Sequence, residues 1–343
     1  MDEQIEKLAN IIKDFRQGEL PVCLDEVHVD RWISQFSESR RLTVLTETTH
    51  ILSEWYFDIE KMTAFLHEVY KQVCTIYTSS DDLVFVDCQK EGKSQHFLIN
   101  MLNDLELSER HVNCILPRRH IIYIDDGLYS GRHIIKDIKS ILQSNEYKEM
   151  TSIDVFVMVG YTDGMAYVES ELEPLCREKG IHFKIYRWRA LSNQKSIQYS
   201  DNMEEYYTQQ DTLWPLSSTK SNKIKCDIEI ITGDKMYYSS REYHRQYKSR
   251  IFSSEKARIT IEEEFLEHGM SVLSDNSIRK GLYPLGFSAY PSLGFGSFCA
   301  NALNISNTCP IVLWWGNIQK MGNILDNWYP LLPRRINSAE AFI

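Results

Sequence analysis

The sequence predicts an α/β fold: a parallel sheet flanked by helices, with an N-terminal helical element and a C-terminal α+β lobe. Between residues 79 and 190, short apolar runs rich in β-branched residues alternate with stretches of helical periodicity. That alternation is typical of parallel sheets with right-handed crossovers. Before it the apolar residues recur at helical spacing only, and after it the chain is rich in turn residues and aromatics. We therefore predict a helical element over 1–78, the α/β core over 79–190, a loop or lid over 191–224 and the C-terminal lobe over 225–343.

Composition indicates a globular protein of the cytoplasm. The 343 residues are 43% hydrophobic and 25% charged, and no apolar run approaches the length that spans a membrane. The acidic N-terminus lacks the features of a signal peptide. Eight cysteines lie at least ten residues apart, which suits free thiols in a reducing compartment. The net charge of −10 argues against attachment of the whole surface to nucleic acid.

The elements follow in order along the chain. Residues 2–16 form one amphipathic helix, and 29–72 continue with helical spacing. The core is expected to contain strands at 83–87, 120–125, 153–160 and 181–188, with helices at 94–105, 131–143 and 165–179. In the C-terminal lobe, residues 225–231 alternate like a half-buried strand, and 254–268 form a helix.

The stretch from Arg119 to His133 is the best candidate site. An apolar strand ends on Asp125 and Asp126, a turn with two glycines follows, and a helical pattern begins after Gly131. Open α/β sheets bind their ligands at this end of the strands. The backbone N–H groups of the turn and the helix N-terminus favour an anion, while the carboxylates suit ribose hydroxyls or a divalent cation. The alternative is an acidic turn before an ordinary capped helix.

A second loop lies between the strand at 83–87 and the next helix. Its end, Gly92-Lys93-Ser94, imitates a nucleotide-binding P-loop, but Asp87 stands where that motif needs glycine. A loop with backbone donors and lysines still suits a diphosphate. We therefore expect Lys90, Gly92, Lys93 and Ser94 to bind one, the alternative being a solvated turn.

The segment from Tyr237 to Arg250 interleaves tyrosines with basic residues. Basic groups for phosphates and aromatic faces for bases are what a nucleic-acid contact needs. We predict contacts with a nucleic acid or partner from Arg241, Arg245 and Lys248. The alternative is an amphipathic helix with a solvated basic face.

The stretch Ile-Tyr-Ile-Asp-Asp-Gly-Leu-Tyr-Ser-Gly resembles the phosphoribosyl-diphosphate motif of the phosphoribosyltransferases. The resemblance implies that Asp125 and Asp126 orient the ribose and bind Mg²⁺, and that Lys93 assists the departing diphosphate. It also implies a 5-phosphate loop made of Tyr129, Ser130, Gly131, Arg132 and His133. Arg132 and His133 depart from the small and hydroxyl residues that usually stand there.

A wider resemblance covers roughly Leu24 to Arg335. Trp32-Ile-Ser-Gln-Phe36 and the tail motifs from Tyr283 to Arg335, together with both loops, resemble the phosphoribosyltransferase-like proteins of bacterial conflict systems. Some of these are encoded beside retron reverse transcriptases. Membership implies a phosphoribosyltransferase-like sheet and a toxin-like effector role in anti-phage defence. The expected partners are a reverse transcriptase with its RNA–DNA or another defence protein, and no membrane.

The favoured function is glycosyl transfer from phosphoribosyl diphosphate or a nucleotide donor, with Mg²⁺. Two alternatives remain open. One is a non-catalytic nucleotide-binding sensor or assembly subunit of a defence complex, which the departures at Arg132 and His133 support. The other is hydrolysis of the N-glycosidic bond of a nucleotide, in which the same pocket passes the ribosyl group to water.

Overall fold

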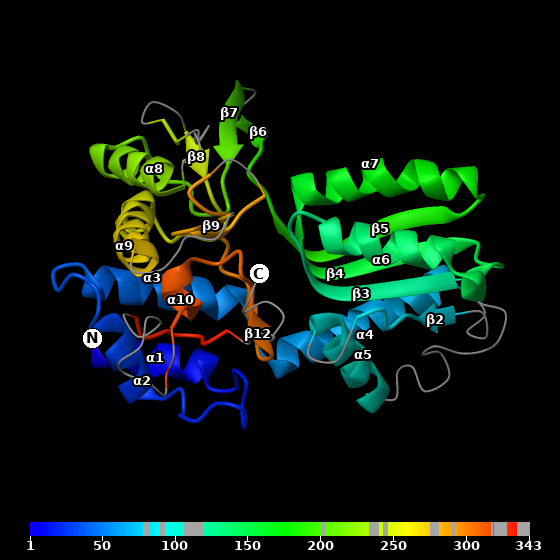
Figure 1. Cartoon of the computed structure of the whole chain (residues 1–343), viewed down its shortest axis with the longest axis horizontal. Coiled ribbons are helices and arrows are strands. Elements are labelled where there is room, and N and C mark those ends of the chain that lie inside the picture. Colours follow the sequence, from blue (N-terminus) through cyan, green and yellow to red (C-terminus); the bar gives the residue numbers. More distant parts are fainter. Residues whose placement is uncertain are drawn as a thin grey trace. The chain divides into compact units, whose positions relative to one another are not determined.

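The computed structural model of the chain forms two compact units (Figure 1). Unit 1 comprises Met1–Ile59 and Asn193–Ile343, and unit 2 comprises Glu60–Ser192. The N-terminal residues thus belong with the C-terminal ones, so the units divide the chain differently from the predicted boundaries. The structure describes residues 1–77, 83–89, 93–105, 120–200, 203–232, 240–242, 246–274, 281–289, 292–316, 318 and 328–334.

Unit 2 contains the predicted parallel sheet. Its strands are β2 (Leu83–Phe85), β3 (His120–Leu128), β4 (Ser152–Tyr161) and β5 (His182–Leu191), in the order β2-β3-β4-β5 and all parallel. Its helices are α4 (Ile59–Ile76), α5 (Ser94–Asp104), α6 (Arg132–Gln143), the 3-10 turn η1 (Asn145–Tyr147) and α7 (Thr162–Glu178). Figure 1 shows α6 and α7 together on one face of the sheet and α4 on the other. The predicted α/β class, a parallel sheet flanked by helices, is confirmed.

The apolar face of α6 explains how the sheet is covered. Ile134, Ile138 and Ile141 recur at helical spacing and are buried against strand residues such as Ile121 and Val155. Burying each such side chain stabilises the fold by about 1.5–3 kcal/mol. This packing fixes the position of the helix N-terminus at the carboxyl edge of the sheet, directly after β3.

Unit 1 combines helices from both ends of the chain with short strands. Its helices are α1 (Asp2–Ile12), α2 (Glu26–Ile33), α3 (Arg41–Trp55), α8 (Thr219–Thr232), α9 (Glu255–Ser274) and α10 (Ile311–Trp314). Its strands are β1 (Tyr56–Phe57), β6 (Lys195–Ser200), β7 (Met203–Gln209), β8 (Tyr247–Lys248), β9 (Leu282–Tyr283), β10 (Gly286–Phe287), β11 (Ala300–Asn301) and β12 (Asn304–Ile305).

Buried hydrogen bonds tie the N-terminal helices to the tail within unit 1. Trp32 Nε1 donates to the carbonyl of Val312 at 3.0 Å, and the ring of His28 bridges Tyr329 Oη and the carbonyl of Leu331, each at 2.8 Å. The N-terminal element therefore packs on the C-terminal segments of its own unit. Sequence spacing could not show this, because the partners lie about 280–300 residues apart.

Two secondary-structure predictions were wrong. The expected loop over 191–224 contains the antiparallel pair β6–β7 and the start of α8, because a period-two pattern is hidden in its polar composition. The expected strand over 225–231 lies inside α8. Ser218 Oγ accepts the N–H of Ser221 at 3.1 Å at the start of that helix, and Ile224 and Ile228 are buried four residues apart.

Within the described ranges, no helix has both the length and the apolar character that crossing a bilayer requires. The seven cysteines in the described part of the chain are all free thiols.

Candidate functional site

The acid pair lies inside β3. The strand continues to Leu128, with Asp125 opposite Val157 and Gly127 opposite Val159 of β4. The turn is therefore shorter than predicted and begins at Tyr129. The backbone ladder that continues past the acids holds them at fixed positions on the sheet.

Asp125 is buried and is held by neutral donors. Only 6% of the residue is exposed. Its Oδ1 accepts the Ser94 hydroxyl at 3.0 Å and the Asp126 N–H at 2.9 Å. Burial raises the pKa of Asp125 well above its usual value, and the neighbouring charge of Asp126 adds to this rise. Asp126 itself is half-buried, so the two acids occupy different environments.

The turn and the start of α6 form a compact cradle of backbone groups. Gly131 takes φ +71° directly before α6, and no side chain caps the first turn of that helix. A Cβ on Gly164 of α7 would lie 1.8 Å from the Tyr129 carbonyl oxygen. The turn thus rests directly on α7. Arg132 and His133 are exposed as the first two residues of α6, where the helix dipole favours an anion.

The upstream loop meets the acid pair through α5. Lys90 and Gly92 lie outside the described residues. Lys93 is half-buried and precedes α5, and Ser94, its first residue, reaches Asp125. The structure therefore brings Ser94, at the end of the predicted diphosphate loop, into contact with Asp125 of the acid pair.

Gln95 braces the backbone of the upstream loop, a role that sequence patterns did not indicate. Its Oε1 accepts the N–H groups of Cys88 at 2.8 Å and Gln89 at 3.1 Å. Its Nε2 is buried and has no hydrogen-bond partner. An unpaired buried donor is costly, so this part of the loop has unused capacity to bind a polar group.

The pair of Asp87 and His96 was also missed. His96 Nδ1 lies 2.6 Å from Asp87 Oδ2, and Asp87 Oδ1 is buried without a partner. Nearby, Gln89 Nε2 donates to Tyr123 Oη at 3.1 Å, and that hydroxyl donates to Asp137 Oδ2 at 2.9 Å. The available signal was an acid directly after a strand and a histidine in the first turn of the following helix.

The predicted nucleic-acid contact at Arg241 was wrong. Arg241 is 1% exposed. Its guanidinium pairs with Glu262 at 2.5 Å and with Glu255, and donates to the Trp214 carbonyl. The described parts of 237–250 are extended rather than helical, and Lys248 is half-buried in β8. Arg245 lies outside the described residues.

The acid pair has the composition of a partial Mg²⁺ site. Among the described residues, no group of three His, Cys, Asp or Glu side chains could hold a metal. Asp125 Oδ1 is already engaged, while its Oδ2 lies 3.5 Å from Gln89 Nε2. Mg²⁺ usually binds one or two carboxylates together with substrate oxygens. The residues therefore fit a cation that arrives with a diphosphate-bearing ligand.

The parallel sheet, with an acid pair inside its strand β3 and a glycine turn before an uncapped helix, defines a phosphoribosyltransferase-like protein. The PRTase-CE family model matches residues 29–334, most of the 343-residue chain, and the chain belongs to that family. Among solved structures, the chain matches the xanthine-guanine-hypoxanthine phosphoribosyltransferase of Helicobacter pylori at 14% identity and a TM-score of 0.25, over 40% of this chain and 88% of that one. No curated protein matches.

Proposed function

We propose that this protein transfers a phosphoribosyl group from phosphoribosyl diphosphate, or a related nucleotide donor, to an acceptor. The observation that carries the proposal is the direct contact between the two predicted loops, Ser94 Oγ to Asp125 Oδ1 at 3.0 Å. A donor that joins ribose to diphosphate needs both binding regions side by side. Membership of the PRTase-CE family supports the same class of donor.

The residues would divide the donor between them. Asp125 and Asp126 would accept hydrogen bonds from the ribose hydroxyls, and the turn 129–131 with Arg132 and His133 would bind the 5-phosphate. Lys93 and Ser94 would bind the diphosphate. Gln95 and the Asp87–His96 pair would hold the backbone of that loop in place.

Mg²⁺ would be held by Asp125 and Asp126 together with donor oxygens, and when bound it would neutralise the leaving diphosphate. Asp125 must be ionised for this, and a nearby cation favours the charged form. Donor binding should therefore be far weaker when EDTA removes the cation.

Calorimetric titration with phosphoribosyl diphosphate tests the proposal. The parent should bind in the presence of Mg²⁺, and the double variant Asp125→Asn, Asp126→Asn should bind at least about a hundredfold more weakly, since two charged contacts are lost. Circular dichroism verifies that the variant is folded. If the double variant binds the donor as the parent does, the site lies elsewhere. Release of diphosphate with candidate acceptors then measures transfer, and release of free base from nucleotides measures hydrolysis.

A non-catalytic nucleotide sensor is the second candidate. Gln95 Oε1 already accepts hydrogen bonds from two N–H groups of the loop. These N–H groups could otherwise donate to a diphosphate. A sensor needs to bind its ligand but not to turn it over. Tight donor binding without diphosphate release, across a wide acceptor panel, would favour this reading.

We also propose that the protein serves as an effector in anti-phage defence. The support is the resemblance of its sequence to phosphoribosyltransferase-like proteins of conflict systems. A partner, such as a reverse transcriptase with its RNA–DNA or another defence protein, would keep the effector inactive. Pull-down from the native host with the gene neighbourhood intact should recover that partner. Recovery of the chain alone, toxic without a trigger, would contradict a guarded effector.

A further inference from the structure

Strand β5 exposes two arginines for which the site described above has no role. Arg187 and Arg189 are both exposed, and none of the ion pairs within the described residues of unit 2 includes either. Lys184, on the same strand, instead interacts with Asp154 and Tyr186. Arg189 lies over the ring of the neighbouring Trp188, 5.4 Å from its centroid. Two exposed guanidinium groups without a carboxylate partner among the described residues thus stand two residues apart in a chain of net charge −10.

The strand register places these arginines level with the candidate site. Asp125 pairs with Val157, which pairs with Arg187. Likewise, Gly127 pairs with Val159, which pairs with Arg189. The backbones of β3 and β5 are therefore about 10 Å apart at these rows, two strand spacings.

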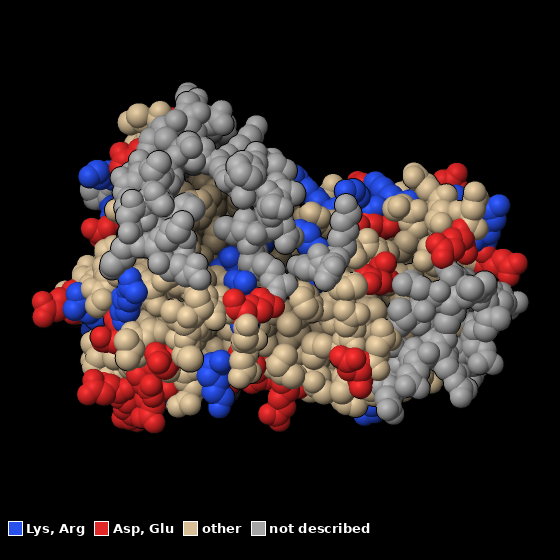
Figure 2. Space-filling model, turned by 60° about the horizontal axis from the view of Figure 1, so that its bottom comes forward, with Lys and Arg blue, Asp and Glu red and all other residues tan. Residues whose placement is uncertain are grey.

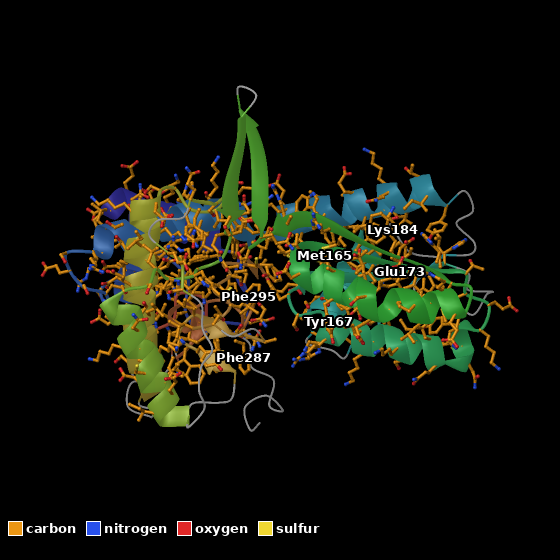
Figure 3. All side chains as sticks on the ribbon, turned by 90° about the horizontal axis from the view of Figure 1, so that it is seen from above. Met165, Tyr167, Glu173, Lys184, Phe287 and Phe295 are labelled. Carbon is orange, nitrogen blue, oxygen red and sulfur yellow. The ribbon has the colours of Figure 1, made fainter. Side chains whose placement is uncertain are left out.

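Both arginines lie on the face of the sheet that α6 and α7 cover. Arg187 Nη1 lies 3.5 Å from Met165 Sδ, at the start of α7, and residues two apart on a strand share a face. Figure 3 shows Met165 at the beginning of α7, with Lys184 and Glu173 further along the unit. The arginines thus lie at the carboxyl edge, where ligands of parallel sheets bind.

Gly160 of β4 leaves room for the side chain of Arg187. A Cβ on Gly160 would lie 3.0 Å from Arg187 Cβ and 2.6 Å from Met165 Sδ. Gly160 is paired with Leu128 on one side and Ala190 on the other. The stem of Arg187 therefore lies over β4, the strand between β5 and the acid pair.

We propose that Arg187 and Arg189 bind the phosphate of the acceptor, and that the acceptor is a small phosphomonoester of nucleotide size. This proposal rests on the proposed transfer function. The loop after β2 would hold the diphosphate on one side of β3, and β5 lies on the other side of β3. Displacement at the ribose C1 brings the acceptor in from the side opposite the leaving group, which is the side of the arginines.

The transfer step then balances with the groups named. The bond from C1 to the diphosphate oxygen breaks, and its electron pair leaves with the diphosphate. A nucleophilic atom of the acceptor supplies the pair for the new bond to C1. The proton that this atom loses passes to the released diphosphate or to water.

The geometry favours one phosphate group over a polymer. Residues two apart on a strand are about 7 Å apart, so both guanidinium groups can grip the oxygens of a single phosphate, for which arginine is well suited. Tight binding of a nucleic acid would need many phosphate contacts. On the coloured part of the visible face, Figure 2 shows basic side chains in one run along the upper edge and otherwise scattered among acidic ones.

The test is calorimetric titration with AMP, CMP, GMP and UMP and with the four matching nucleosides. Saturating ribose 5-phosphate is present, so that the turn at 129–133 is already filled. The parent should bind at least one nucleotide and bind its nucleoside far more weakly. Arg187→Gln with Arg189→Gln should weaken nucleotide binding about tenfold or more, since charge-assisted contacts to phosphate are lost. Arg177→Gln, an exposed arginine near the other end of α7, should change nothing.

Two further measurements separate this inference from the proposed function. Both arginine variants should keep the parent's affinity for phosphoribosyl diphosphate with Mg²⁺, and Arg187→Lys with Arg189→Lys should retain part of the nucleotide affinity, which excludes misfolding as the cause. Loss of donor binding in the glutamine variant would assign the arginines to the donor and overturn the inference. Equal nucleotide binding by variant and parent, no nucleotide binding by the parent, or binding of single-stranded oligonucleotides only would also overturn it. A parent that binds no donor would instead overturn the proposed function.

Discussion

Each unit buries charged side chains, and the two units differ in how that charge is balanced. In unit 1 the guanidinium cluster consists of Arg241, Arg258, Glu255 and Glu262, with three of its members no more than 2% exposed. Glu262 accepts from both arginines and from the Trp214 N–H. In unit 2, Asp125 is nearly as buried, but no ion pair within the described residues includes it.

This difference is the one we expect between a structural cluster and the proposed binding site. Opposite charges that satisfy each other's hydrogen bonds can be buried with a small net effect on stability. A carboxylate buried with only neutral donors disfavours the folded state unless it is protonated or a ligand arrives. Near Asp125, moreover, Asp87 Oδ1 and Gln95 Nε2 are buried without hydrogen-bond partners. In the guanidinium cluster, no buried side-chain atom lacks a hydrogen-bond partner.

The largest expected effect comes from breaking the guanidinium cluster. Glu262→Ala leaves two arginines buried without their main counter-charge and should lower the free energy of unfolding by about 3–5 kcal/mol. Urea denaturation followed by circular dichroism measures this loss. Donor binding by unit 2 should not change at a temperature where the variant is folded.

Glu267→Ala is the matched control on the same helix, α9. Glu267 is 54% exposed in its pair with Lys220, so its removal should cost no more than about 1 kcal/mol. Equal losses of unfolding free energy in Glu262→Ala and Glu267→Ala would show that the guanidinium cluster does not stabilise unit 1 more than a surface ion pair does.

The second-largest expected effect is on donor binding rather than on stability, and it comes from a change in the proposed binding site. Lys93→Ala should weaken Mg²⁺-dependent donor binding by roughly 1.5–3 kcal/mol, the contribution of one charge-assisted contact, and should leave the unfolding free energy close to that of the parent. Calorimetric titration measures the affinity. Lys139→Ala, which removes a half-exposed pair with Glu171 on the surface of α6 and α7, should have no effect on binding. A donor affinity unchanged by Lys93→Ala would remove this loop from the site.

The sequence could predict the α/β sheet and the position of the acid pair, because both depend on local periodicity. The change from strand to helical spacing near Gly131 predicted a helix over 131–143, and α6 occupies Arg132–Gln143. Hydrophobic patterns of this length are strong signals. The hairpin β6–β7 was missed because its few apolar residues, such as Ile197 and Tyr199, stand among polar ones and give only a weak period-two signal.

The environment of single charged residues could not be predicted. Whether Arg241 is a surface contact or a buried anchor depends on Glu255 and Glu262, which follow it by 14 and 21 residues and reach it only through tertiary packing. The role of Gln95 likewise follows from side-chain geometry and has no sequence pattern. Arg187 became a candidate only through the strand register, which sequence spacing within one strand does not define.

The third and smallest effect concerns the pH dependence of stability. Burial raises the pKa of Asp125 above the unfolded value of about 3.8, so the folded state holds its proton more tightly than the unfolded state does. The contribution of Asp125 to the free energy of unfolding then falls as the pH rises from about 4 towards the folded pKa. Asp125→Asn cannot titrate, and its amide oxygen can still accept from Ser94 and from the Asp126 N–H.

Asp125→Asn should therefore unfold at a higher temperature than the parent at pH 7, and the difference should disappear near pH 4. We expect this gain to be smaller than the loss in Glu262→Ala, because the two hydrogen bonds to Asp125 Oδ1 partly offset the cost of its charge. Thermal unfolding at both pH values measures it, with Asp137→Asn, another acid of unit 2, as the comparison. A variant less stable than the parent at pH 7 would mean that Asp125 is ionised and balanced like Glu262. The contrast between Asp125 and the guanidinium cluster would then fail.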